Sequence, residues 1–172
     1  MVNKGKKQST AEFFAFSYRL SGTYDNSKQS LGDALYESST AYLMINDVYI
    51  SPIDRPAEIS ANYNNAVIVK RGLSFMLTMD KNVALRRDQK YGSYLGIKLT
   101  PVFLTLPFFE VRGDLRLPGR FAPRVLLSSQ TEGFLTLMNV TAHPSSDPTI
   151  TYEGEAGIVN KAKISFMGLD VQ

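Results

Sequence analysis

Hydrophobic and polar positions alternate along much of this chain, which is the pattern of β-strands. From Phe14 to Tyr24, apolar residues and glycine alternate with serine, arginine and threonine, and the alternation returns from Phe109 to Leu117 with charged residues at the polar positions. A period of two residues is typical of a strand with one buried face. Further strands, bounded by glycine, proline and asparagine breaks, are expected over residues 41–50, 58–79 (two strands), 95–106, 133–142, 149–152 and 156–169.

Helical signals are few and short. Ser30 is followed three residues later by Asp33, which is typical of a helix N-terminus, and this helix is expected to run to about Ser38. Residues 121–127 allow one short helix at best, with a proline early in the segment, and residues 81–87 have some helical character. The chain is therefore predicted to be mainly β.

The same succession of segments occurs twice. Four blocks recur in the same order 90 to 92 residues later, and their first residues are Tyr18, Asn46, Ala66 and Ser74. A repeat of this length is too long for a solenoid and fits two small domains, or two halves of one pseudo-symmetric domain. We therefore expect an internal duplication that gives two similar small antiparallel β-barrel or sandwich units, each with one short helix.

The repeat predicts four parts of the chain: a flexible basic leader (1–13), a first β repeat (14–79), a connecting segment (80–105) and a second β repeat (106–172). The leader holds three lysines, and no apolar run behind them is long enough for a signal peptide. Nowhere do about 18 apolar residues follow one another, so no transmembrane segment is predicted. Because the sequence also has no cysteine, we expect a cytoplasmic protein.

Gly22 and Gly113 occupy equivalent positions in the two repeats, and both fall on the apolar face of their strands. Glycine inside a strand often marks a β-bulge or a place where another backbone comes close. We therefore predict a structural role for both glycines.

Residues for catalysis or metal binding are scarce in this sequence. His143 is the only histidine and lies in a predicted loop with Ser145 and Asp147, whereas a catalytic triad needs groups that a rigid fold brings together. Glu153 and Glu155 share one face of a strand, where a solvated edge is expected rather than an acid–base pair. Phosphate-binding glycine loops and dinucleotide motifs are absent from the sequence. We predict no enzyme activity, no catalytic residue, no cofactor and no metal site.

Basic residues are concentrated in the middle of the chain. The formal net charge is +3, whereas residues 81–124 hold nine basic and three acidic side chains. Such an excess can bind polyanions, and phenylalanines nearby could stack on bases. The alternative explanation is a solvated strand face with ion pairs to Glu110 and Asp114. The candidate polyanion-binding residues are Arg86, Arg87, Arg112, Arg116, Arg120 and Arg124.

The second repeat carries three motifs in order. A glycine-centred strand ends in Leu117-Pro118, a Phe-Leu-x-Leu strand follows at residues 134–137, and a Val-Asn-Lys segment occupies residues 159–161. With these motifs the chain resembles bacterial small β-domains of unknown function, here in tandem duplicate. The resemblance implies a small β-domain and no known activity.

These observations favour a non-catalytic binding or scaffolding module that acts through protein–protein contacts at sheet edges. The partner is expected to be another protein or a second copy of the chain, and the apolar run Val102–Leu106 could either join the halves or form the interface of a homo-oligomer. Binding of nucleic acid or another polyanion through residues 81–124 is the alternative. Adhesion of the leader to an anionic membrane is a further hypothesis, although three lysines are few for firm attachment.

Overall fold

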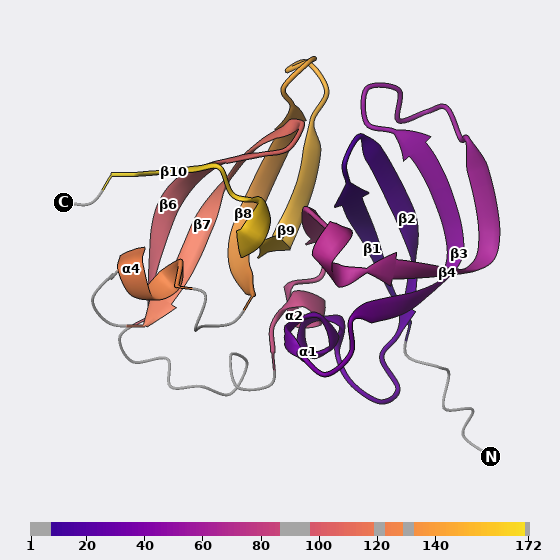
Figure 1. The fold of residues 1–172 in the computed structure, drawn as a ribbon, viewed down its shortest axis with the longest axis horizontal. Coiled ribbons are helices and arrows are strands. Elements are labelled where there is room, and N and C mark those ends of the chain that lie inside the picture. Colours follow the sequence, from indigo (N-terminus) through magenta and orange to yellow (C-terminus); the bar gives the residue numbers. More distant parts are fainter. Residues whose placement is uncertain (1–7, 87–96, 119–122, 129–132, 171–172) are drawn as a thin grey trace.

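Ten strands form one antiparallel sheet in the computed structural model of the chain, which describes residues 8–86, 97–118, 123–128 and 133–170 (Figure 1). The strands are β1 (Gln8–Ala15), β2 (Tyr18–Asp25), β3 (Tyr42–Pro52), β4 (Ala61–Val69), β5 (Phe75–Thr78), β6 (Ile97–Leu106), β7 (Phe109–Pro118), β8 (Phe134–Pro144), β9 (Tyr152–Asn160) and β10 (Phe166–Leu169). The helices of these described residues are α1 (Leu31–Tyr36), α2 (Lys81–Ala84) and α4 (Pro123–Leu126), with 3-10 helices η1 (Lys70–Gly72) and η2 (Lys161–Lys163). The prediction of a mainly β chain is confirmed.

The strand order in the sheet is β10-β6-β7-β8-β9-β5-β1-β2-β3-β4. We call the described residues up to 86 the first half and those from 97 onward the second half. The two halves have the same strand order, β5-β1-β2-β3-β4 in the first and β10-β6-β7-β8-β9 in the second. In each half the last strand along the chain pairs with the first, and the other three strands follow in sequence. The halves join where β5 pairs with β9, and Figure 1 shows them on opposite sides of this junction. The described strands form one open sheet that ends at β4 and β10, so separate barrels or sandwiches are not confirmed, and the internal duplication stays a prediction.

The first strands begin earlier in the chain than the hydrophobic pattern indicates. The segment from Phe14 to Tyr24 is not one strand but parts of the hairpin β1–β2, with a tight turn at Phe16, whose φ is 52°. The sequence does not reveal this turn because neither glycine nor proline occurs in it. β1 starts at Gln8, so residues 8–13 of the expected leader belong to a strand, and residues 1–7 lie outside the described part of the chain.

Unusual backbone conformations recur at equivalent positions of the two halves. Phe16 and Phe108 both have positive φ, at 52° and 67°, in the first hairpin of their half. Asp47 and Asn139 also have positive φ, at 50° and 52°, within β3 and β8. Positive φ is uncommon outside glycine, so its recurrence at both pairs of positions shows that the halves share local backbone geometry as well as strand order.

Two lysines fix the correspondence between the halves more closely than the sequence does. The backbone N–H of Lys70 donates to the carbonyl of Ala41 (2.9 Å), and that of Lys161 donates to the carbonyl of Gly133 (3.0 Å). Each lysine Nζ also donates to a backbone carbonyl at the end of its own half's helix, α1 or α4, at 2.6 and 2.8 Å. Lys70 therefore corresponds to Lys161 at a spacing of 91 residues. The sequence comparison, which aligns the block that begins at Ala66 with the block that begins at Ala156, at a spacing of 90, is one residue out of register here.

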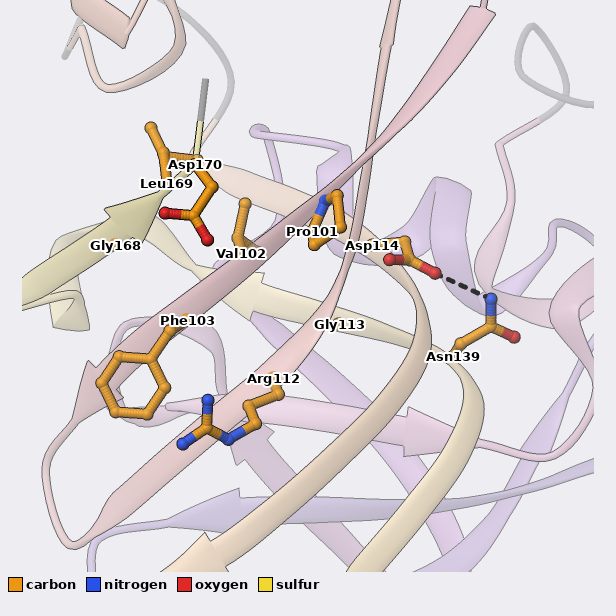
Figure 2. A pocket seen from close by; sticks show the side chains of 10 residues that line it. All are labelled: Pro101, Val102, Phe103, Arg112, Gly113, Asp114, Asn139, Gly168, Leu169 and Asp170. Atoms are coloured by element: carbon orange, nitrogen blue, oxygen red, sulfur yellow. Dashed lines mark hydrogen bonds between the residues drawn. The ribbon is translucent and has the colours of Figure 1, made fainter. Parts of the chain in front are cut away.

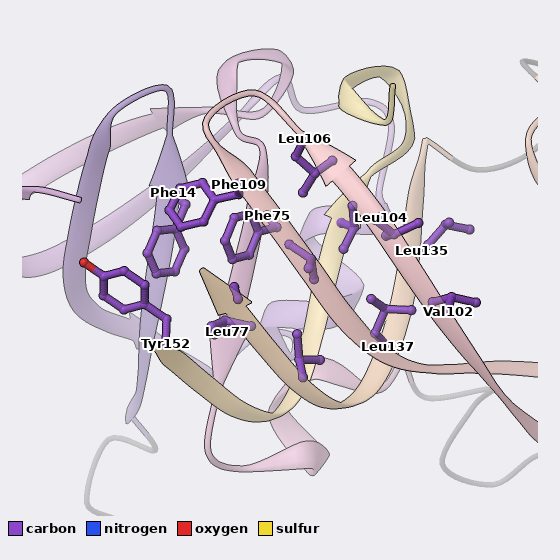
Figure 3. Close-up of a cluster of buried hydrophobic side chains, with 14 of the residues drawn as sticks. Phe14, Phe75, Leu77, Val102, Leu104, Leu106, Phe109, Leu135, Leu137 and Tyr152 are labelled. Atoms are coloured by element: carbon purple, nitrogen blue, oxygen red, sulfur yellow. The ribbon is translucent and has the colours of Figure 1, made fainter. Parts of the chain in front are cut away.

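Each half surrounds its own hydrophobic core. The first core is formed mainly by β1, β3, α1 and α2, and the second mainly by β6 to β9; Figure 3 shows the second. The junction strands contribute to both cores. Met76 and Ile158 belong to the first core, whereas their neighbours Phe75 and Val159 belong to the second. Because successive side chains of a strand point to opposite faces, β5 and β9 tie the two cores together.

Gly22 and Gly113 each lie where the register between two strands shifts. A Cβ at Gly22 would be 3.0 Å from the carbonyl oxygen of Asn46, and a Cβ at Gly113 would be 3.1 Å from that of Met138. These distances are tighter than normal Cβ contacts, and the neighbouring atoms are backbone. Glycine at both positions therefore allows the third strand of each half to come close to the second.

The first helix forms where its N-terminal signal lies. Ser30 Oγ accepts a hydrogen bond from the backbone N–H of Asp33 at 3.1 Å, and α1 begins at Leu31. Gly32 lets α1 approach α2, because a Cβ there would be 2.1 Å from the carbonyl oxygen of Ala84. The helix within residues 81–87 and the helix within 121–127 form as α2 and α4, of four residues each.

Candidate protein-interaction surfaces

The junction of the two halves shows how this chain builds an interface from strand edges. β5 and β9 pair in the register Phe75 with Val159 and Met76 with Ile158. All four side chains are completely buried, at 0% exposure. Burying a large apolar side chain contributes about 1.5–3 kcal/mol, so these pairs make the junction a hydrophobic interface as well as a backbone ladder.

Polar groups at the junction are paired across it. Asn160 is buried at the end of β9, and its Nδ2 donates to the carbonyl of Leu73 in the first half at 2.9 Å. On the same face of the sheet, the hydroxyls of Tyr36 in α1 and Thr136 in β8 lie 2.7 Å apart in a hydrogen bond. Buried polar groups are costly unless paired, so these bonds specify how the second half is oriented on the first.

Aromatic rings fill the opposite face of the junction (Figure 3). Phe14 and Phe75 of the first half stack with centroids 4.4 Å apart, and Phe109 of the second half meets both rings edge-on. Tyr152 packs edge-on against Phe14 and donates its hydroxyl to the carbonyl of Ile53 at 2.8 Å. Burial is the main cause that raises the pKa of Tyr152, so this hydroxyl stays protonated and remains a donor.

The free end of the sheet at β4 presents an apolar surface. Tyr42 pairs with Val69 and Met44 pairs with Val67 across β3 and β4, and all four side chains are about half exposed, from 48% to 53%. We call these four residues the β4 surface. Large apolar side chains grouped in this way on a protein surface commonly mark an interaction site.

The β4 surface is not among the residues that sequence reasoning selects. The signal is present in part, because residues 41–50 are apolar at positions of both strand faces, which a half-buried strand does not need. What the sequence does not contain is the strand order. Only the pairing shows that β4 ends the sheet while its counterpart β9 lies inside it.

The opposite end of the sheet, at β10, exposes Phe166 and borders an open pocket of about 450 Å³ between β6, β7, the middle of β8 and β10 (Figure 2). Figure 2 shows Arg112 beside the ring of Phe103, and the guanidinium carbon is 4.6 Å from the ring centroid. Asn139 Nδ2 donates to Asp114 at 3.0 Å on the other side of the pocket. The pocket is thus lined by apolar side chains, one arginine and two carboxylates, of which Asp114 is bound to an amide and Asp170 lies beside β10.

The six candidate arginines do not all lie on one element. Arg112 and Arg116 lie on the same face of β7, separated by Asp114, and Arg124 is exposed on α4. Arg86 follows α2 in the first half, where its guanidinium carbon is 4.4 Å from the centroid of the Tyr36 ring. Arg87 and Arg120 lie outside the described residues.

A second pocket of about 450 Å³ lies where α1, the end of β4 and the start of β8 meet. Lys70 lines it and donates its Nζ to the carbonyl of Glu37 at 2.6 Å. Burial lowers the pKa of Lys70, and the nearby Glu37 carboxylate partly opposes this effect. Since the amine is engaged with a backbone carbonyl, its role here is to hold the end of α1, as Lys161 holds the end of α4.

Side chains with catalytic potential are placed in structural roles. His143 lies near the end of β8, paired with Glu110 of β7, and not in the predicted loop. Its Nδ1 lies 2.9 Å from the carbonyl oxygen of Ile150 in the loop that joins β8 and β9. Asp147 accepts hydrogen bonds from the backbone N–H and hydroxyl of Thr149, which are the main causes that lower the pKa of its carboxyl. Glu153 and Glu155 are exposed on β9. The described residues contain no group of three histidine, cysteine, aspartate or glutamate side chains able to hold a metal ion.

Among the described residues, no helix has both the length and the apolar character needed to cross a bilayer. Comparison with known proteins gives no match to a protein-family model, to a curated protein or to a solved structure.

Proposed function

We propose that this chain is a non-catalytic protein-interaction module whose binding surfaces are the two free ends of its sheet. The observation that carries the proposal is the β4 surface, where four large apolar side chains stay half exposed on paired edge strands. An open edge offers unpaired backbone groups to a partner strand, and apolar neighbours add the burial that makes such pairing stable.

We further propose that the two halves arose by internal duplication. Their common strand order, the positive φ angles at equivalent residues and the equivalent lysines support it. The duplication explains how an interface can appear at free edges, because the second half already uses its own β8–β9 edge to bind the first half. The corresponding edge of the first half, β3–β4, has the same architecture and lacks an occupant within the described chain.

Site-specific photo-crosslinking tests the proposed function. A photoreactive phenylalanine analogue placed at position 67, in the cells that make the protein, should give crosslinked products. The same analogue placed at position 99 should give no crosslinked product. Leu99 is about as exposed as Val67, but its counterpart in the first half is Gln8, which is exposed and lies outside the junction. Equal yields from both positions, or no product from position 67, would refute the proposal.

Polyanion binding is the second candidate function. Its support is Arg112, which lies over Phe103 beside Arg116 on an exposed strand face, an arrangement of cation and aromatic ring that suits stacked bases. A labelled single-stranded oligonucleotide should then bind at low salt, and Arg112→Ala should weaken binding. Arg55→Ala, which removes an exposed arginine outside residues 81–124, is the matched control. No binding at low salt ends this candidate.

A further inference from the structure

We infer that the partner of the β4 surface is the β10 end of a second copy of this chain, paired in the register that β9 and β5 use inside one copy. This inference rests on the proposed function, because it identifies the occupant of the same surface. The starting point is the strand order: β9 is the fourth strand of its half and β5 the fifth of the other. The two strands left free, β4 and β10, are again a fourth and a fifth strand.

The internal junction specifies the register of the expected pairing. At the spacing of 91 residues, Ile158 and Val159 of β9 correspond to Val67 and Ile68 of β4. Phe75 and Met76 of β5 correspond to Phe166 and Met167 of β10. Because Met76 faces Ile158 and Phe75 faces Val159 inside one copy, Met167 should face Val67, and Phe166 should face Ile68, between copies.

Side-chain burial supports this register. Ile158 and Phe75 each reach into the core of the other half and are completely buried, whereas their counterparts Val67 and Phe166 are 53% and 56% exposed. Met167, like Met76, already packs on the core of its own half. In the proposed pairing Val67 would enter the second core of the neighbouring copy beside Met167. Both large exposed residues would then be buried as their counterparts are.

The rest of the β4 surface has counterparts in the junction too. Tyr42 and Met44 correspond to Phe134 and Thr136 of β8, which meet Tyr36 of α1 through a ring contact and a hydrogen bond. Lys70 binds the carbonyl of Glu37, and Tyr36 is the residue before Glu37. In the second half Lys161 binds the carbonyl of Leu126 in α4, so the residue that corresponds to Tyr36 is Val125.

Val125 is 62% exposed, so α4 offers an apolar contact where α1 offers the Tyr36 ring. An apolar Met44 in place of the hydroxyl-bearing Thr136 fits this change, since a valine side chain carries no hydroxyl as Tyr36 does. The β4 surface and α4 are therefore complementary in chemistry. Where the β4 surface has Met44 in place of Thr136, α4 has Val125 in place of Tyr36, so the polar pair of the internal junction becomes an apolar pair. This agreement favours a second copy over an unrelated partner.

Two positions make the pairing between copies weaker than the internal junction. Gly157 lies so close to β5 that a Cβ there would be 3.0 Å from the carbonyl oxygen of Met76, and its counterpart on β4 is Ala66. Asn160, which bonds across the junction, is replaced by Val69. A second copy must therefore sit slightly farther out, without the amide bond. This fits a reversible β4–β10 contact between chains and a stable β5–β9 junction within each chain.

The contact is head to tail, because β4 of one copy binds β10 of the next. Contacts of this type close into a ring when the rotation allows and otherwise extend into a filament. The proposed assembly therefore differs from a two-fold dimer in which the same edge pairs with itself. That difference can be measured.

Engineered cysteines test both the partner and the register, since the chain has no cysteine of its own. Chains carrying Val67→Cys and chains carrying Met167→Cys should, when mixed and oxidised or treated with a short bis-maleimide, give a crosslinked species of two chains. Val67→Cys mixed with Phe166→Cys should not, because neighbouring residues of β10 point to opposite faces. Crosslinking of Val67→Cys with itself alone would overturn the head-to-tail contact.

Mass measurement completes the test. Light scattering after size exclusion should show assemblies at about 100 µM that dissociate on dilution, and Val67→Lys or Phe166→Lys should raise the dissociation concentration at least about tenfold. Leu99→Lys should leave it unchanged. A monomer at this concentration overturns the inference. If photo-crosslinking at position 67 then captures a different protein, the interaction function stands while the second copy is excluded; if it captures nothing, both fail.

Discussion

Replacing Asn160 by alanine tests whether the junction between the halves is specified by a buried amide. Asn160 Nδ2 donates to the carbonyl of Leu73 at 2.9 Å, and Oδ1 accepts from the backbone N–H of Ala162 at 3.1 Å. The side chain is only 6% exposed, so water does not replace these partners freely. Alanine would leave the buried carbonyl of Leu73 without its partner, whereas the N–H of Ala162, an exposed residue, can bond to water. One buried orphan group costs roughly 1–3 kcal/mol, so we expect a loss of about 1–3 kcal/mol in the free energy of unfolding.

Val69→Ala is the matched control, because Val69 is the counterpart of Asn160 at the free edge and is about half exposed. Truncation there should cost less than about 1 kcal/mol, within the range of strand propensity. Asn160→Asp should be worse than Asn160→Ala, since a carboxylate oxygen would face the carbonyl of Leu73. Urea unfolding followed by far-UV circular dichroism, at one protein concentration, gives all three values. An Asn160→Ala chain no less stable than Val69→Ala would refute the assigned role.

Three further predictions concern single contacts. Gly113→Val should cost about 1–3 kcal/mol by overpacking against Met138 and Leu137, while Gly133→Ala, with open space around it, should change the unfolding free energy by less than about 0.5 kcal/mol; equal thermal melts would contradict the assigned packing. Tyr36→Phe removes the bond to Thr136 and should cost about 0.5–1.5 kcal/mol in urea unfolding, an effect that should disappear if Thr136 is first changed to valine. The pKa of the Asp147 carboxyl, measured by NMR, should lie below its ordinary value and should rise in Thr149→Val. Because the pKa is lower in the folded state than in the unfolded state, the carboxylate contributes stability above the ordinary carboxyl pKa. This contribution is lost as the pH falls through the lowered pKa.

The elements with local signals were predictable from the sequence. Ser30 and Asp33 place the start of α1, period-two alternation places β7, and the breaks at glycine, proline and asparagine place β3, β6 and β8 to within a few residues. The turn at Phe16 was not predictable, because its positive φ is held by the hairpin rather than by glycine or asparagine. Pro101 predicts an interruption of the strand, because proline has no N–H to donate to a neighbouring strand. β6 nevertheless continues through Pro101, and the sequence cannot show whether a partner strand needs that N–H.

The candidate surfaces depend on long-range pairing and were less accessible to sequence reasoning. Charge composition directs attention to the arginines of residues 81–124, yet the structure distributes the described ones over β7, α4 and the segment after α2. Val67 and Ile158 are both apolar residues in similar segments, and nothing local distinguishes them. One is exposed and the other buried only because β9 pairs with β5 on its second edge, whereas β4, paired with β3 on one edge, has no partner strand on the other within the described chain.

The composition of β4 carries a further argument about its edge. β5 covers only residues 156–159 of β9, so the counterpart segment of β4 is residues 65–68. Asn62 and Asn64, which precede this segment, correspond to Glu153 and Glu155, and those two glutamates stay exposed although β9 lies inside the sheet. Polar residues thus occur in the part of each strand that the fifth strand does not reach. In β9 the apolar residues begin at Ala156, where β5 starts to pair, and in β4 they begin one position later, at Ala66, after Asn65. An edge that only needed protection from aggregation would be polar or charged along its whole length. The change from polar to apolar along β4 still places Val67 and Ile68 where a fifth strand would pair, as Ile158 and Val159 are placed in β9, and this is what an edge requires if such a strand is to bind it.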